Sequence, residues 1–153
     1  MGTDLRHLVR SGYNPSSVIG CDLRQAFIDL GHELYADRET CPVPFFVGDV
    51  LDIDLCSFPP QADKAGPSLR DVRRLKDLRG RVKYVYAGSL FHLFDEGTQE
   101  AIARRLATLL DVTPGSGPAI VFGRHSGKVV EGMMDDVMGR YVSDLLCGCR
   151  FRC

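Results

Sequence analysis

The sequence has 153 residues, 44% hydrophobic and 25% charged, which is enough for one domain with a hydrophobic core. Its 19 lysines and arginines nearly balance its 20 aspartates and glutamates, so the net charge of -1 gives no field that favours nucleic acid or an anionic membrane. No apolar run approaches the roughly 20 residues that span a bilayer, and the N-terminus MGTDLRHLVRSG lacks an apolar signal core, so we expect a cytoplasmic protein.

The first part of the chain predicts helices and short strands in alternation. Residues 4–10 and 24–36 carry apolar side chains at helical spacing, which predicts two helices. The apolar run at 18–21 predicts a short buried strand between them. After two prolines, the sequence FFV at 45–47 predicts a second buried strand, which ends at a Gly-Asp pair.

The middle of the chain combines a loop with a basic stretch. Residues 57–68 (SFPPQADKAGPS) predict a loop, and residues 69–78 predict a helix with leucine and valine on one side. A basic stretch typically forms a phosphate-binding face or a solvated helix face, and the interspersed Asp71 and Asp77 favour the solvated face. Its basic residues are Arg70, Arg73, Arg74, Lys76, Arg79, Arg81 and Lys83.

The last regular elements follow the same alternation. Residues 83–90 predict a third strand, 95–110 the clearest helix, and 119–122 a fourth strand. Helices alternating with short, continuous apolar strands indicate an α/β fold with a mostly parallel sheet and helices on both faces. The pattern fades near residue 140, so we predict one domain over 1–140 and an atypical tail over 141–153.

The six cysteines give little support for a metal site. Three are scattered, including Cys21 inside the first apolar run, and this favours free, buried thiols in a reducing compartment. The other three crowd into the terminal CGCRFRC, where a zinc site would need a fourth ligand that neither a Cys-x-x-Cys pair nor a nearby histidine supplies. We therefore predict no metal.

Two carboxylates directly follow predicted strands, Asp22 the first and Asp49 the second. Parallel sheets bind ligands beyond the carboxyl ends of their strands, and in dinucleotide folds an acid there accepts hydrogen bonds from ribose hydroxyls. Asp22 suits a ribose diol, and Asp49 suits an exocyclic amine such as that of adenine. The alternatives are a helix N-cap for Asp22 and a turn acid for Asp49.

Three segments carry a resemblance to a known family: "VIGCDLRQAFIDLGHELYADRETCPVPFFVGDVLD", "VYAGSLFHLFDEGTQEAIARRLATLL" and "GRHSGKVVEGMMDD". They resemble the fungal S-adenosylmethionine-dependent methyltransferases of meroterpenoid biosynthesis, of the austinol and terretonin type. The resemblance covers residues 3–140 and implies the Rossmann-like class I methyltransferase fold. It implies S-adenosyl-L-methionine as the cofactor and methylation of a small polyketide–terpenoid substrate, typically giving a methyl ester.

The resemblance also assigns the cofactor site. It places Asp22 at the ribose with Leu23 beside the adenine, and it makes Asp49 and Val50 the adenine-binding pair. Ala87 and Gly88 correspond to the strand that passes the methionine end of the cofactor.

The sequence differs from the family pattern at both ends of the chain. The glycine-rich turn and the first strand should lie about 20 residues before Asp22, which reaches Gly2, and YVSDLLCGCRFRC replaces the C-terminal strands. We therefore expect a truncated chain without those strands. The alternative function is a non-catalytic methyltransferase remnant or a partner-binding fragment, and a homodimer is a further expectation.

No pattern identifies a catalytic group. Methyl transfer is largely a matter of positioning, and a carboxylate acceptor is already ionised near neutral pH, so it needs no general base. His92 and His125 are candidates at or just after strand ends, where each either orients substrate or makes a local hydrogen bond. Three aromatic residues either line a substrate wall or, as is favoured, pack in the core: Tyr86, Phe91 and Phe94.

Two other classes of protein fit part of the pattern. A nicotinamide-dependent dehydrogenase would also use an acid after its second strand, but the later segments favour the methyltransferase. A receiver-like signalling domain needs an acid pocket and a strand-end lysine, and Gly123 and Arg124 stand at that place instead.

Overall fold

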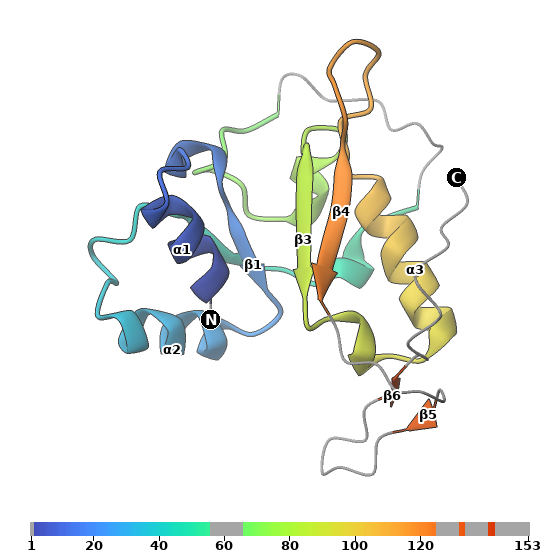
Figure 1. Cartoon of the computed structure of the whole chain (residues 1–153), viewed down its shortest axis with the longest axis horizontal. Coiled ribbons are helices and arrows are strands. Elements are labelled where there is room, and N and C mark those ends of the chain that lie inside the picture. The colour runs from blue at the N-terminus through green and yellow to red at the C-terminus, as the bar shows by residue number, and fades with distance from the viewer. Residues whose placement is uncertain (1, 56–65, 125–131, 134–140, 143–153) are drawn as a thin grey trace.

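A computed structural model describes residues 2–55, 66–124, 132–133 and 141–142 (Figure 1). Its helices are α1 (Thr3–Arg10), α2 (Gln25–Tyr35) and α3 (Glu96–Ala107). Its strands are β1 (Gly20–Asp22), β2 (Phe45–Val47), β3 (Tyr84–Gly88), β4 (Ile120–Arg124), β5 (Gly132–Met133) and β6 (Tyr141–Val142). The predicted α/β class with parallel strands is therefore confirmed. Within these described ranges, every helix is too short or too polar to cross a membrane.

The parallel strands form two separate pairs. β1 pairs with β2, and β3 pairs with β4, while β5 and β6 form a small antiparallel pair. In the described part of the chain no strand joins β1 to β3. Figure 1 shows that β1, β3 and β4 run from the upper part of the view towards its lower part, and β2 is parallel to β1. Their carboxyl ends therefore lie at the same end of the molecule.

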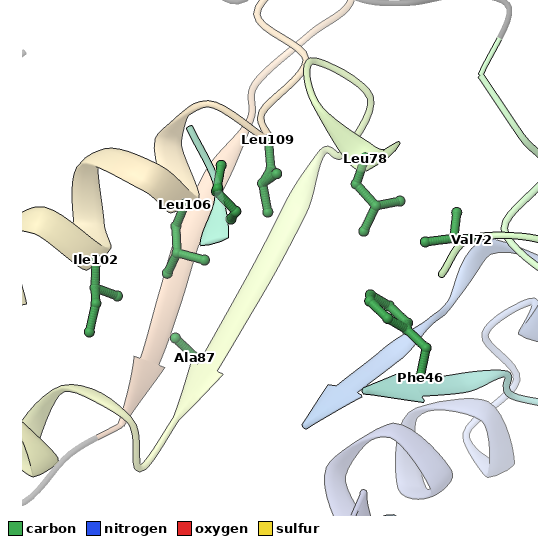
Figure 2. Packing of buried hydrophobic residues seen from close by; sticks show 8 residues of the cluster. Phe46, Val72, Leu78, Ala87, Ile102, Leu106 and Leu109 are labelled. Carbon is green, nitrogen blue, oxygen red and sulfur yellow. The ribbon is translucent and has the colours of Figure 1, made fainter. Parts of the chain in front are cut away.

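One hydrophobic core joins the two pairs (Figure 2). Phe46 reaches it from β2 and Ala87 from β3, while Ile102 and Leu106 enter from α3. The cluster consists of Phe46, Ile53, Val72, Leu78, Ala87, Ile102, Leu106 and Leu109. Because parallel strands are stable only when their faces are covered, this shared core holds together two pairs that exchange no strand hydrogen bonds.

Helix α3 begins and ends for identifiable reasons. The Asp95 carboxylate accepts the N–H of Thr98 at 2.9 Å, which caps the helix and lowers the pKa of Asp95. The helix was predicted to reach residue 110 but stops at Ala107. Beyond it the Leu109 carbonyl accepts the N–H of Val82 at 3.0 Å, so the chain leaves the helix to pair with the segment before β3.

The prediction of a helix over 69–78 is wrong, because the structure has turns and a short 3-10 helix at Leu75–Leu78. The Asp77 carboxylate accepts the N–H of Arg74 at 3.1 Å, and the Arg73 guanidinium donates to two nearby carbonyls. These side chains therefore occupy backbone groups that an α-helix would need.

A buried arginine fastens α1 to the end of α2. The Nε and Nη2 of Arg6 donate to the two carboxylate oxygens of Asp37 at 2.6 and 2.9 Å. The Nδ1 of His32 lies 2.8 Å from Asp37, and the guanidinium packs 4.7 Å from the Tyr35 ring and 5.1 Å from the Phe45 ring. We call Arg6, His32 and Asp37 the arginine clasp.

The arginine clasp should make stability depend on pH. Hydrogen bonding from Arg6 holds the pKa of Asp37 far below its ordinary value, although partial desolvation opposes this. A depressed carboxyl pKa stabilises the fold above the unfolded-state pKa of about 3.9, and this contribution is lost as the pH falls below that value. Asp37→Asn should therefore lower the free energy of unfolding at pH 7 and flatten its decline between about pH 5 and 2. Urea denaturation at several pH values measures this, and the exposed Glu39→Gln is the control. Equal slopes in Asp37→Asn and the unsubstituted chain would contradict the prediction.

The shared core should be sensitive to loss of volume. Ile102 is 0% exposed and lies where α3 meets the strands. Ile102→Ala should lower the free energy of unfolding by about 2–5 kcal/mol through lost burial and the cavity that remains. Urea denaturation measures the change. Leu93→Ala, at a position that is 46% exposed, should cost less than about 1 kcal/mol, and equal losses in both variants would show that Ile102 is not central to the core.

Candidate functional site

The carboxyl ends of β1 and β2 form one edge that carries two acids. Asp22 ends β1 opposite Val47, and the N–H of Gly48 donates to the Asp22 carbonyl at 3.0 Å. Asp49 follows directly. Parallel pairing therefore brings to one edge the two carboxylates that the sequence predicts to share a site.

Asp22 shapes the turn into α2 with one oxygen. Its Oδ1 accepts the N–H of Arg24 at 3.0 Å, and Arg24 itself is the N-cap residue of the helix. The alternative in which Asp22 is the N-cap is therefore wrong. Its Oδ2 has no hydrogen-bond partner among the described residues, so it remains available as an acceptor. Leu23, next along the chain, is exposed beside it.

Asp49 opens the short 3-10 helix at Val50–Asp52. Its carboxylate accepts the N–H of Leu51 at 2.8 Å, so the turn-acid alternative is confirmed. Val50 packs against the core, and the Leu51 carbonyl accepts a hydrogen bond from Arg105 of α3 at 3.2 Å. This turn is held on both sides, which fixes the position of the Asp49 carboxylate.

Cys21 directly precedes Asp22 in β1 and lies near both acids. Its Sγ is 3.5 Å from the Gly48 carbonyl, and its residue surface is exposed, so the prediction of a buried thiol is wrong. Partial desolvation of the sulfur, together with the negative charges of Asp22 and Asp49, raises the pKa of Cys21 to about 12. Both carboxylates therefore act on the same thiol.

A hollow of about 240 Å³ adjoins Asp49. Sequence patterns identify Asp49 and the basic stretch separately. They do not predict that residues of the basic stretch line a hollow beside Asp49. Arg81 and Lys83 of that stretch serve the fold, because Arg81 donates to the Pro67 carbonyl at 2.8 Å and Lys83 pairs with Asp111 at 3.1 Å. The hollow is lined by Val47, Gly48, Asp49, Asp52, Arg73, Arg74, Leu75 and Lys76.

Ala87 and Gly88 end the other parallel pair. Ala87 is buried in the shared core, whereas Gly88 is exposed opposite Arg124. The chain then turns sharply at Ser89, whose φ of 58° is in the left-handed region. These residues lie at the same end of the molecule as Asp22 and Asp49, but in a different strand pair.

The histidine candidates receive no support as substrate contacts. His92 lies in a 3-10 helix at Phe91–Leu93 and is only 5% exposed, which favours a local role. His125 lies outside the described residues. Phe91 and Phe94 pack against the core as favoured, whereas Tyr86 is exposed, with its ring 5.4 Å from the Phe122 ring.

Among the residues that the structure describes, one cluster has ligand atoms close enough for a metal ion. His32, Asp37 and Cys41 offer a nitrogen, an oxygen and a sulfur within 4.8 Å of one another. Arg6 already places its positive charge there through the arginine clasp. The positive charge of the Arg6 guanidinium therefore already occupies this cluster. The cysteines of the terminal CGCRFRC lie outside the described residues.

The sequence of this chain is similar to fungal methyltransferases, and the predicted resemblance is thereby confirmed. It is 35% identical over 132 residues to the O-methyltransferase phiE of a fungal species, covering 86% of this chain and 37% of that protein. It is 35% identical over 127 residues to the O-methyltransferase atr3 of Stereocaulon alpinum, covering 83% and 31%. To the methyltransferase ausD of Penicillium brasilianum it is 31% identical over 116 residues, covering 75% and 36%.

The chain spans about a third of the length of these curated relatives. No protein-family profile matches the chain, and no solved structure matches it significantly.

The effect of Asp22 and Asp49 on the pKa of Cys21 should be measurable from the pH dependence of thiol reactivity. In a variant that keeps Cys21 alone, reaction with a disulfide reagent should be slow at pH 8 and accelerate towards about pH 12, because only the thiolate attacks. Asp22→Asn with Asp49→Asn should shift this profile to lower pH. The reaction rates of a variant with the exposed Glu39→Gln substitution, measured in the same way, provide the control. An unshifted pH profile in the double variant would show that the two acids do not act on the thiol.

Proposed function

We propose that this chain has the Rossmann-like class I methyltransferase fold and binds S-adenosyl-L-methionine for methyl transfer. The observation that carries the proposal is the meeting of Asp22 and Asp49 at one strand-end edge. Both acids lie in a segment of the chain that is similar to named methyltransferases.

The acids suit the two polar ends of adenosine. The Oδ2 of Asp22 would accept hydrogen bonds from the ribose hydroxyls, and Asp49 would accept from the adenine amine. Leu23 and Val50 would contact the flat faces and edge of the base, and Gly88 would lie towards the methionine end. When bound, the cofactor supplies an electrophilic methyl group on its sulfonium.

The acceptor we propose is an oxygen of a small secondary metabolite, such as the carboxylate of a polyketide–terpenoid intermediate. Two of the similar proteins are named O-methyltransferases, which supports oxygen as the acceptor atom. A carboxylate is ionised near neutral pH, so the protein need only orient it and exclude water. This agrees with the burial of His92 away from solvent.

Isothermal titration of the 153-residue chain with S-adenosylhomocysteine tests the proposal. Binding in the micromolar range is expected for the unsubstituted chain, and Asp22→Ala should weaken it by about tenfold or more, because a charge-assisted hydrogen bond contributes about 1.5–3 kcal/mol. Asp49→Ala should weaken binding less if its carboxylate remains partly occupied by the N–H of Leu51.

Glu39→Ala is the matched control, because it removes an exposed acid outside the site. Titration with NAD separates the dehydrogenase alternative, since both ligands carry adenosine but only one carries a thioether. Absence of heat from a chain shown by circular dichroism to be folded, or tighter binding of NAD, contradicts the proposal.

A further inference from the structure

One face of the β3–β4 pair is apolar and uncovered by the described helices. Side chains alternate along each strand, so Val85, Ala87 and Val121 face the shared core. The opposite face, which we call the open sheet face, carries side chains that are 37% to 54% exposed. They are Tyr84 and Tyr86 from β3, opposite Ile120 and Phe122 from β4.

Helix α2 carries a second exposed apolar surface. Its buried residues Ile28 and Gly31 face the molecule. Phe27, Leu30 and Leu34 follow one another at spacings of three and four, so they form one stripe along the helix. We call these three residues the α2 stripe, and they are 42% to 65% exposed.

We propose that a second copy of this chain covers both surfaces, the α2 stripe of each copy lying on the open sheet face of the other. Parallel strands are normally covered by helices on both faces, and the α2 stripe is a helix face that stays exposed among the described residues. Each copy offers one surface of each kind. Because the exchange is reciprocal, it closes as a two-fold dimer and does not extend into a filament.

The exposed area of the open sheet face and the α2 stripe favours an interface that uses both surfaces of each copy over one that uses a single surface. At their observed exposures, the seven side chains present roughly 500–850 Å² of mostly apolar surface per copy, since large apolar side chains have about 150–250 Å² each. A stable interface buries about 800 Å² per partner. Either surface alone would supply about half of that area, whereas both together approach it.

Charge complementarity sets the direction of docking. Arg124 lies two residues beyond Phe122 on the same face of β4 and makes no ion pair among the described residues. Glu33, one turn from Leu30 on the border of the α2 stripe, likewise makes none within the described ranges. A helix laid along the strands with Leu34 towards their carboxyl ends brings Glu33 to Arg124 of the other copy.

Sedimentation velocity on the 153-residue chain, from about 1 to 100 µM, tests the proposal. A monomer–dimer equilibrium is expected. Glu33→Arg and Arg124→Glu should each weaken the dimer about three- to tenfold, because each sets two like charges against one another. The double variant should return to within about threefold of the unsubstituted chain, since it restores the pair with reversed signs.

A second variant tests the apolar contact without changing charge. Leu34→Gln, at an exposed helix position, should also weaken the dimer, whereas Tyr13→Ser, at an exposed position outside both surfaces, should not. Far-UV circular dichroism checks that each variant is folded. A monomer at all concentrations, open-ended oligomers, a dimer indifferent to these substitutions, or a double variant as weak as the single ones would overturn the proposal.

Discussion

The parallel pairing of β1 with β2 is the constraint on which the candidate site depends. It places Asp22 opposite Val47 and carries the pairing on to Gly48, so the acid after each strand reaches the same edge. A shift of one residue in this register would turn every side chain of one strand to the other face. The exposed Cys21, which responds to both carboxylates, marks the point where the two chain segments meet.

Much of the fold was predictable because local patterns and tertiary packing agree. The strand at 45–47 was found at its observed position and the helix start within one residue, since an apolar run after prolines and acids in a first helical turn are local signals. The segment 69–78 had helical spacing but formed turns, because Asp77 and Arg73 bond to the backbone in place of helical partners. The spacing of apolar residues alone does not show that side chains will form these hydrogen bonds to the backbone.

The candidate site was only partly predictable. Asp22 and Asp49 were found because acids at strand ends are visible in the sequence, and the fold brings them together. The hollow beside Asp49 was not predicted. It forms because residues 73–76 lie next to Asp49 in the fold, and no sequence motif indicates that contact. Burial of His92 and exposure of Cys21 likewise depend on packing between distant segments. Residue type and spacing leave that packing undetermined.

The arginine clasp also constrains the order in which the chain can become stable during synthesis. Arg6 and Asp37 are separated by 31 positions, so at about 5–20 residues per second the ribosome adds the carboxylate roughly 2–6 s after the guanidinium. Helix α1 has eight residues, too few to persist alone in water. Helix α1 therefore lacks its Asp37 partner during that interval and gains it only after α2 and the turn that follows it have been synthesised.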